Sequence, residues 1–360
     1  MIKTIHTATI RRLGSHPALQ RAPKSKERPL TKAPASPTQF FTNMPTPDLP
    51  VILFGYTSSP FTQKVRLALK LKAIPYTYMT VPSMLPRPLI ISKLNIGYRK
   101  IPILALGREI YCDTAIILEA LEHFFSPEEG YGTLYPICAD GRRYKSLSRG
   151  FASYWTDRPL FRVTTGLIPA RVWRTRFGDD RAELIGHRLD ADKLERKLPD
   201  NLARLDSQLS LLEGMFGEDE GRGLWVFSSQ KPGLADVAVF YQLQWGREIS
   251  AGRVVADLTG GAAEDSDDEG VGRIFNAERY PKVWKWFRRM ELYFEDLPAV
   301  EERDPEVEGV LRRMREAPAL GKRSLLLPTP RADLLELSEK TGLREGVEVS
   351  VAPDDTGKDE

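Results

Sequence analysis

The sequence predicts an α/β domain followed by an all-helical domain. Between residues 51 and 125, short apolar runs that end in turn residues alternate with segments of helical periodicity. After residue 140 the strand patterns nearly vanish, while helical periodicity continues. A chain of 360 residues is long enough for two such domains.

The first domain is predicted to have the element order β-α-β-α-β-β-α. Val51–Phe54 is a short apolar run that ends at Gly55, which is typical of a buried strand. Ser59-Pro60 then opens a helix that runs to Lys72, because serine is a preferred N-cap and proline a preferred first helical residue. The other elements are a strand at 76–81, a short helix at 88–94, a hairpin at 101–112 and a helix at 113–125. This order is that of a thioredoxin-like domain, over residues 50–126.

The second domain, over residues 140–297, is predicted to be helical. Helical patterns occupy 140–157, 181–213, 234–250 and 280–295, and Pro199 is expected to break or kink the second of them. Residues 259–272 are rich in glycine and acidic residues, so we expect a mobile loop there.

Both ends of the chain lie outside these domains. Eight prolines fall between Pro17 and Pro50, so residues 1–49 are expected to form a disordered basic arm. The first 26 residues lack Asp and Glu, as in a mitochondrial transit peptide; a solvated tail or a start at Met44 are the alternatives. Residues 298–360 are expected to be a partly disordered extension. Its helix at 332–341 and its lone strand at 347–351 are expected to be dispensable for catalysis.

Composition and charge exclude several classes of function. The net charge is +3, but residues 1–46 carry eight Lys or Arg and one Glu, which leaves −4 for the rest. The basic charge belongs to the arm and does not indicate a nucleic-acid-binding body. No apolar run is long enough to span a bilayer. Cys112 and Cys138 are the only cysteines, too few for a disulfide framework or a metal cluster, which fits the reducing cytoplasm.

The first chemical signal is the run Ser58-Ser59-Pro60-Phe61, at a strand-to-helix junction. A hydroxyl there lies beside unpaired helix N–H groups and the positive end of the helix dipole, where a thiolate is stabilised. Lowering a thiol pKa from ~8.5 by two units takes about 2.7 kcal/mol. One hydrogen bond to a charged acceptor supplies ~1.5–3 kcal/mol and the dipole ~0.3–1 kcal/mol. The alternative is a serine that only caps the helix.

Two further signals lie downstream. In Lys100-Ile101-Pro102, a proline at the start of a strand marks an edge strand or a special turn. With a cis Ile101–Pro102 bond, the backbone of Ile101 can pair with an extended peptide. Asp113-Thr114 opens a helix, where the carboxylate can hold an ammonium group and the hydroxyl can hold a carboxylate. The structural alternative for Pro102 is an ordinary edge-strand proline, and that for Asp113-Thr114 is a helix cap.

The run from Phe54 to Leu69 resembles the opening of glutathione transferases. Its Ser-Pro-Phe is similar to the tau class, and omega enzymes place a cysteine before the same proline. Pro102 follows Ser59 by 43 residues and Asp113 follows Pro102 by 11, which is the spacing of that family. The combination with long arms looks like fungal proteins of this family.

The resemblance implies a role for three residues near the first helix. Ser59 is the hydroxyl that stabilises the glutathione thiolate. Ser58 is the second candidate, and Tyr56 is the third, because other classes use a tyrosine near this strand end.

The resemblance also implies the residues that bind glutathione. Lys100 takes the glycyl carboxylate, and Ile101 pairs with the cysteinyl unit beside a cis Pro102. Asp113 and Thr114 take the γ-glutamyl end, although this pair replaces the usual Glu-Ser or Gln-Ser of the family.

The second domain carries weaker resemblances. Gly233–Ala238 resembles the capping motif of the family before a buried helix, and Tyr280–Trp286 resembles the opening of the last helix. Tyr154 and Trp155 are candidates to line an electrophile pocket, together with Trp173, Tyr241 and Trp245. Packing in the helical core is the alternative for these aromatic residues.

Together these patterns predict a glutathione-dependent transferase that acts on a small hydrophobic electrophile without a metal. A non-catalytic binding module of the same fold and a small-molecule carrier are the alternatives. We expect a cytoplasmic protein, or a mitochondrial one if residues 1–26 act as a transit peptide, and a homodimer remains open.

Overall fold

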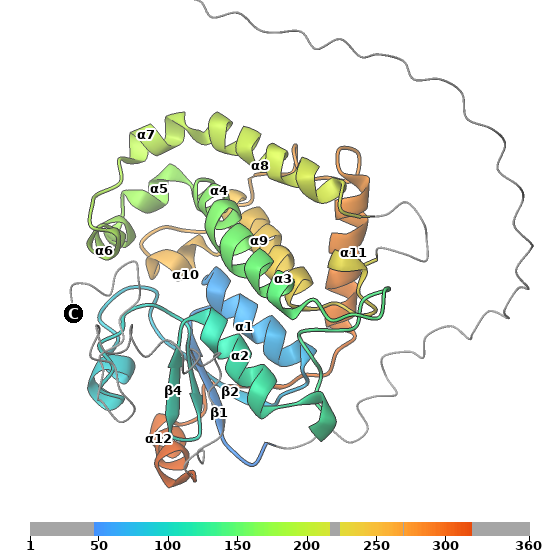
Figure 1. Cartoon of the computed structure of the whole chain (residues 1–360). Helices are drawn as coiled ribbons and strands as arrows, with labels where there is room; N and C mark the ends of the chain where they lie inside the picture. Colours follow the sequence, from blue (N-terminus) through green and yellow to red (C-terminus); the bar gives the residue numbers. More distant parts are fainter. Residues whose placement is uncertain (1–46, 217–223, 269, 319–360) are drawn as a thin grey trace, which may run out of the picture. The chain divides into compact units, whose positions relative to one another are not determined.

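The computed structural model describes residues 47–216, 224–268 and 270–318 (Figure 1). In these residues a mixed five-stranded sheet with flanking helices carries a helical domain between its fourth and fifth strands. The predicted fold class is confirmed. The expected N-terminal arm falls almost entirely outside the described residues, as do the helix at 332–341 and the strand at 347–351.

The sheet has the strand order β4-β3-β1-β2-β5. β1 and β2 are parallel, β3 and β4 form an antiparallel hairpin beside β1, and β5 pairs in parallel with β2. The strands are β1 Val51–Gly55, β2 Tyr76–Thr80, β3 Ile103–Leu106, β4 Glu109–Cys112 and β5 Glu301–Arg303. The first four strands lie within two residues of their predicted bounds.

β1 is buried on both faces, which explains its unbroken apolar sequence. Val51 and Leu53 belong to the cluster that includes residues of helices α1 (Pro60–Leu71) and α2 (Thr114–Phe124). Ile52 and Phe54 belong to a separate cluster on the other face. Side chains alternate along a strand, so one short run serves two apolar layers.

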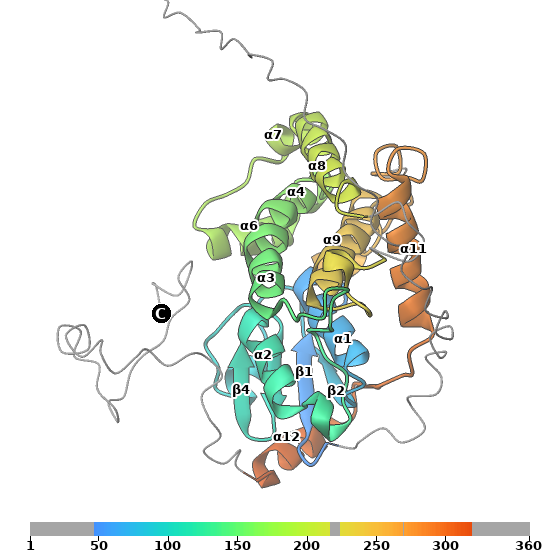
Figure 2. The ribbon, with the colours of Figure 1, turned by 45° about the vertical axis from the view of Figure 1, so that its right-hand side comes forward.

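The second face of the sheet is covered by the C-terminal extension. The predicted short helix at 88–94 is a single π-helical turn, Leu89–Lys93, which covers only part of this face. Helix α12 (Val307–Glu316) adds Val310, Leu311 and Met314 to the cluster on that face. Figure 2 shows α12 beside the sheet, at the end of the molecule opposite α7 and α8. Residues 298–318 are therefore part of the first domain, although the sequence presented them as an extension beyond it.

The helical domain is built around α9 (Leu234–Ser250), which is buried along most of its length. α9 and α11 (Pro281–Glu295) match the predicted helices at 234–250 and 280–295. The other helices are α3 Lys145–Gly150, η4 Phe151–Leu160, α4 Phe161–Thr165, α5 Ala170–Trp173, α6 Arg176–Ile185, α7 Ala191–Arg196, α8 Leu198–Glu213 and α10 Val255–Thr259, with single 3₁₀ turns at Pro127–Glu129 and Val226–Ser228.

Two helical predictions differ from the structure. The segment expected at 140–157 begins at Lys145 and runs on through a π-helical stretch around Pro159, which has no N–H for an α-helical bond. The segment expected at 181–213 is three helices, α6, α7 and α8. Pro199 lies in the first turn of α8, where its missing N–H costs nothing.

Asp236 fixes the start of α9, as the capping motif implied. Its carboxylate accepts the backbone N–H groups of Val226 (2.9 Å) and Gly233 (3.0 Å), and the indole N–H of Trp286 (2.9 Å). Burial raises the pKa of Asp236 to about 6 despite these hydrogen bonds. The three donors join the loop before α9 to α11.

The fifth strand is held to the first domain by a charged cluster. Glu301 accepts two hydrogen bonds from Arg66 of α1, at 2.8 and 3.1 Å, and a short one from the Tyr76 hydroxyl of β2. Burial by itself would raise the pKa of Glu301, but the hydrogen bonds from Arg66 and Tyr76 outweigh it and hold that pKa below its ordinary value.

We predict that Leu311→Ala lowers the free energy of unfolding by about 2–4 kcal/mol, because it opens a cavity under the sheet. Leu311 is 2% exposed, and urea denaturation is the measurement. Val307→Ala, on the same helix but 36% exposed, is the control and should change stability by less than about 0.5 kcal/mol. Equal, small effects of both substitutions would contradict the structural role of α12.

We predict that Glu301→Gln costs about 2 kcal/mol of stability at pH 7, because two charge-assisted hydrogen bonds are weakened. The folded-state pKa is below the unfolded one, so this stabilisation is present above the unfolded pKa and is lost as the pH falls through the folded pKa. Urea titrations of both proteins from pH 7 downward should therefore converge below about pH 4. A constant gap over this range would show that the charge of Glu301 does not matter.

Candidate functional site

Three loops that carry the predicted site residues meet at one edge of the sheet. β1 ends at Gly55, and its neighbour Phe54 lies opposite Ile103, where β3 begins. Ile103 in turn lies opposite Cys112, where β4 ends. The segments 56–59, 100–102 and 113–114 therefore enter or leave the sheet side by side. The structure brings together the residues that the spacing predicted.

Ser59 is the N-cap of α1. Its backbone is extended (φ −78°, ψ 116°), and its hydroxyl oxygen accepts the N–H of Thr62 at 3.2 Å. Pro60 follows as the first helical residue and has no N–H to satisfy. The capping bond uses only a lone pair of the oxygen, so the hydroxyl proton of Ser59 is available to a further acceptor. The side chain is 2% exposed.

Ser58 is held through its backbone. Its N–H donates to Asp257 Oδ2 at 2.7 Å, and its carbonyl accepts the indole N–H of Trp245 at 2.9 Å. Its own hydroxyl is buried and has no hydrogen-bond partner within the described residues. The third candidate, Tyr56, is half-buried, and its hydroxyl accepts a 3.3 Å hydrogen bond from Arg181 of α6.

The loop before β3 has the predicted backbone. The Ile101–Pro102 peptide bond is cis, as the sequence analysis expected. Pro102 is buried, whereas Lys100 and Ile101 are half-buried. Among the described residues, neither the N–H nor the carbonyl of Ile101 has a backbone partner. An extended peptide can therefore pair with Ile101 at this edge.

Asp113 and Thr114 begin α2. Asp113 is exposed and has φ 74° and ψ 131°, a backbone conformation that costs a non-glycine residue about 1–3 kcal/mol. Its carboxylate accepts the N–H of Ala115 at 2.8 Å, so it also caps the helix. Thr114 is buried, and its hydroxyl accepts a 3.4 Å hydrogen bond from the ammonium group of Lys64. The strained backbone of Asp113 is of a kind that is typical of functional sites.

A buried ion pair that was not predicted from the sequence lies beside Thr114. Lys64 of α1 is 1% exposed, and its ammonium lies 2.6 Å from Asp157 of η4, which also accepts the Tyr241 hydroxyl at 2.7 Å. Burial and the charge of Asp157 raise the pKa of Tyr241 well above its ordinary value. The signal was present, because Lys64 lies at helical spacing between the buried Pro60 and Ala68.

Cys112, the last residue of β4, carries a thiol at this edge of the sheet. Burial, together with the charge of Asp113, raises the pKa of Cys112 to about 11. It is therefore protonated at neutral pH and is not an activated nucleophile.

The assignment of Tyr154 and Trp155 to an electrophile pocket stays a prediction. Tyr154 is 70% exposed and lies under the guanidinium of Arg158. Trp155 packs against Phe151 at 4.7 Å between ring centroids, on the core of the helical domain, which agrees with the alternative of core packing.

A different apolar cluster lies beside the site. It packs against Tyr56 and against Met84 of the loop after β2. Trp173 and Trp245, two of the aromatic candidates from the sequence, belong to it. Its buried members come from the connection before α5 and from α5, α6, α9 and α10: Ile168, Val172, Phe177, Trp245, Ile249, Val255 and Leu258.

The acidic segment 259–272 is not the free loop that its composition suggested. Ser266 N–H donates to the carbonyl of Gly252 (3.0 Å), and Asp268 N–H donates to that of Ala251 (2.9 Å). Asp267 forms an ion pair with Arg253. These bonds return the segment to the end of α9, so its acidic residues neutralise nearby arginines.

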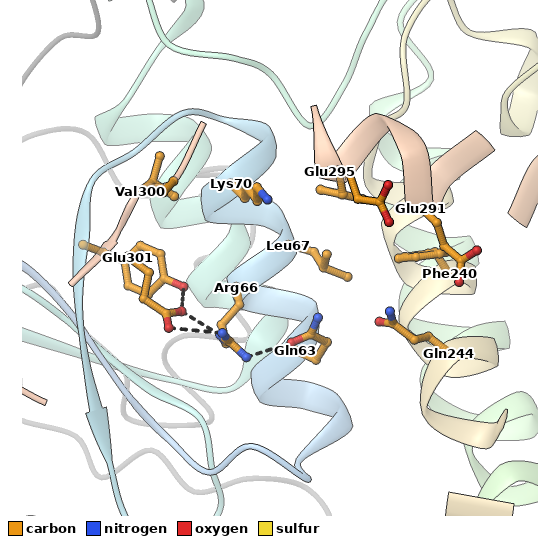
Figure 3. Close-up of a pocket in the computed structure, with 13 residues that line it drawn as sticks. Gln63, Arg66, Leu67, Lys70, Phe240, Gln244, Glu291, Glu295, Val300 and Glu301 are labelled. Carbon is orange, nitrogen blue, oxygen red and sulfur yellow. Dashed lines mark hydrogen bonds and ion pairs between the residues drawn. The ribbon is translucent and has the colours of Figure 1, made fainter. Parts of the chain in front are cut away.

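A cavity of about 420 Å³ lies elsewhere, between α1, α9 and α11 (Figure 3). Figure 3 shows Gln63, Arg66 and Lys70 on one wall, and Gln244 and Glu295 on the other. The cavity contains none of the residues predicted to bind glutathione. Its Arg66 is already bound to Glu301, so we assign the cavity no part in the chemistry.

No group of three His, Cys, Asp or Glu side chains in the described residues is arranged to hold a metal ion. None of the helices there combines the length and the apolar character that a membrane crossing needs.

Comparison with known proteins gives the same family at the N-terminal domain. Residues 53–129 match the family model of the glutathione S-transferase N-terminal domain, and residues 165–296 match a domain of unknown function. Glutathione S-transferase U1 of Arabidopsis thaliana is 28% identical over 38% of this chain and 57% of its own length. Glutathione S-transferase U3 of the same plant is 24% identical over 52% of this chain and 68% of its own length. The chain thus spans between half and about two thirds of these relatives.

Solved structures with similar folds include a glutathione-transferase-like protein from Pseudomonas syringae, with 24% identity, 78% of each chain covered and a TM-score of 0.46. A tau-class enzyme from mango has 19% identity and a TM-score of 0.45, over 74% of this chain and 97% of its own. Residues 53–129 thus match a glutathione S-transferase N-terminal domain, and the plant relatives that the chain resembles are named glutathione S-transferases.

Proposed function

We propose that the protein is a glutathione-dependent transferase in which Ser59 stabilises the glutathione thiolate. The observation that carries this proposal is the position of the Ser59 hydroxyl. Its oxygen accepts the capping hydrogen bond of α1, so its proton can still be donated to a sulfur atom. The hydroxyl belongs to the loop that lies at one sheet edge with the cis-proline loop and the start of α2.

The energy required is modest. A thiol with a pKa near ~8.5 needs about 2.7 kcal/mol of differential stabilisation to become mostly ionised at neutral pH. One charge-assisted hydrogen bond contributes ~1.5–3 kcal/mol, and the end of the α1 dipole ~0.3–1 kcal/mol. A general base is therefore unnecessary for forming the thiolate.

Glutathione would lie across the three loops. The unpaired backbone of Ile101 supports antiparallel pairing with the cysteinyl unit, next to Pro102. A carboxylate held by Thr114 would come close to the ammonium of Lys64, which already reaches that hydroxyl. Lys100 would take the glycyl carboxylate at the open side of the loop.

The second substrate would be a small apolar electrophile. The apolar cluster that packs on Tyr56 and Met84 lies beside the loop that carries Ser59. Attack of the thiolate forms a carbon–sulfur bond and expels a leaving group such as chloride, while the thiol proton goes to solvent. Conjugation of this kind is a detoxification reaction.

One observation favours a non-catalytic binding module as the second candidate. The side chains of Ser58 and Ser59 are 1% and 2% exposed, so the helical domain closely covers the point where the sulfur would bind. A binder could use the half-buried Lys100 and Ile101 and the exposed Asp113 without admitting an electrophile.

We predict that Ser59→Ala lowers turnover of glutathione with an activated aromatic chloride at pH 7 by at least about tenfold, through the loss of one charge-assisted hydrogen bond. Retention on glutathione-agarose should change little. Ser58→Ala and Tyr56→Phe are the matched comparisons, and a loss of activity in one of them instead of Ser59→Ala would reassign the role. Urea denaturation checks for the loss of the cap, which costs about 1 kcal/mol.

The wild-type protein separates the candidate functions in the same assay. Retention on glutathione-agarose together with turnover supports the transferase. Retention without turnover supports the binding module, and the absence of both would refute glutathione as the ligand.

A further inference from the structure

We propose that Asp257 and Trp245 of the helical domain are positioning residues that fix the backbone of Ser58 and thereby aim the Ser59 hydroxyl at the sulfur. This inference rests on the proposed function of Ser59. Neither residue touches the reacting atoms in this scheme, and both act through the peptide units that join Ser58 to its neighbours.

The hydrogen bonds from Asp257 and Trp245 hold two consecutive peptide units. The Ser58 N–H, which donates to Asp257 at 2.7 Å, belongs to the peptide unit before Ser58. The Ser58 carbonyl, which accepts from Trp245 at 2.9 Å, belongs to the unit after it. Ser59 N–H donates to the carbonyl of Tyr56 at 3.1 Å, so the loop is closed on itself as well. The orientation of Ser59 is thus fixed from both sides.

Local folding does not account for these contacts. Asp257 and Trp245 follow Ser58 by 199 and 187 residues, and they come from α10 and α9. The cap of α1 needs only Ser59 and Thr62, which are in contact without them. A second domain that reaches the one loop carrying the reactive hydroxyl indicates a constraint on that loop.

The short helix that carries Asp257 is itself braced. Its Val255 and Leu258 are buried in the apolar cluster, and the carbonyl of Leu258 accepts the Ser83 hydroxyl at 2.8 Å. Asp265 accepts the N–H of Ala256 at 2.8 Å. Asp257 is exposed on one side, but its Cα cannot move without disturbing this packing. The carboxylate therefore provides a fixed acceptor for the loop.

The orientation of the Ser59 side chain matters because its hydroxyl forms two hydrogen bonds in this scheme. Its oxygen must keep the bond to Thr62 N–H while its proton points at the sulfur. A misplacement of about 1 Å at a reacting group can lower a rate by up to about a hundredfold. Loss of one of the two backbone contacts should cost a smaller part of this.

The test uses the full chain and compares kcat and KM for glutathione with an activated aromatic chloride. We expect Asp257→Ala and Trp245→Phe each to lower kcat by about tenfold while KM for glutathione changes less than about twofold. Asp257→Asn should restore at least half of the wild-type kcat, because its amide oxygen can still accept the Ser58 N–H. Asp267→Ala is the matched control: it removes a carboxylate that pairs with Arg253 and not with the loop of Ser58, and kcat should not change.

The outcomes separate the two proposals. Unchanged kcat in Asp257→Ala and Trp245→Phe, with Ser59→Ala impaired, would overturn the positioning role and leave the proposed function intact. Equal losses in Asp257→Ala, Asp257→Asn and Asp267→Ala would also overturn it, because that pattern reflects general destabilisation. A wild-type protein without turnover would refute the proposed function, and the positioning role with it. If Asp257→Ala does not fold, Trp245→Phe decides the question.

Discussion

Helix α1 contributes to two hydrophobic cores at once, and the rest of the molecule depends on this arrangement. Val65 and Leu69 pack with the sheet, whereas Leu67, Ala68 and Leu71 pack with α9 and its neighbours. A third face holds Lys64, buried against Asp157 of the helical domain. A helix fixed on three sides cannot rotate, so its first turn presents Ser59 in one orientation. The residues that we propose to bind glutathione are organised around that fixed helix end.

The fold of the first domain was predictable because its signals are local. The apolar run before Gly55, the Ser59-Pro60 start and the hairpin turn each specify an element from a few neighbouring residues. The spacing of the three motifs matched that of a known family, and the structure places their loops at one edge of the sheet. The predicted cis bond before Pro102 is confirmed.

Contacts between distant segments were not predictable in this way. Lys64 and Asp157 are 93 residues apart, and nothing near either residue identifies its partner. The strand Glu301–Arg303 has no apolar alternation, because its pairing relies on backbone bonds and on Arg66. The hydrogen bonds that hold the backbone of Ser58 come from α9 and α10, and local sequence patterns do not predict them either.

The return of the chain to the first domain also has a consequence for biosynthesis. β5 completes a sheet whose other strands end at Cys112, and α12 covers one of its faces, so 188 residues, which include the whole helical domain, are translated in between. While the ribosome makes them, the nascent first domain has an unpaired β2 edge and an uncovered apolar face. The part of the protein that is synthesised first is therefore completed last, and until then it is the part that a chaperone would recognise.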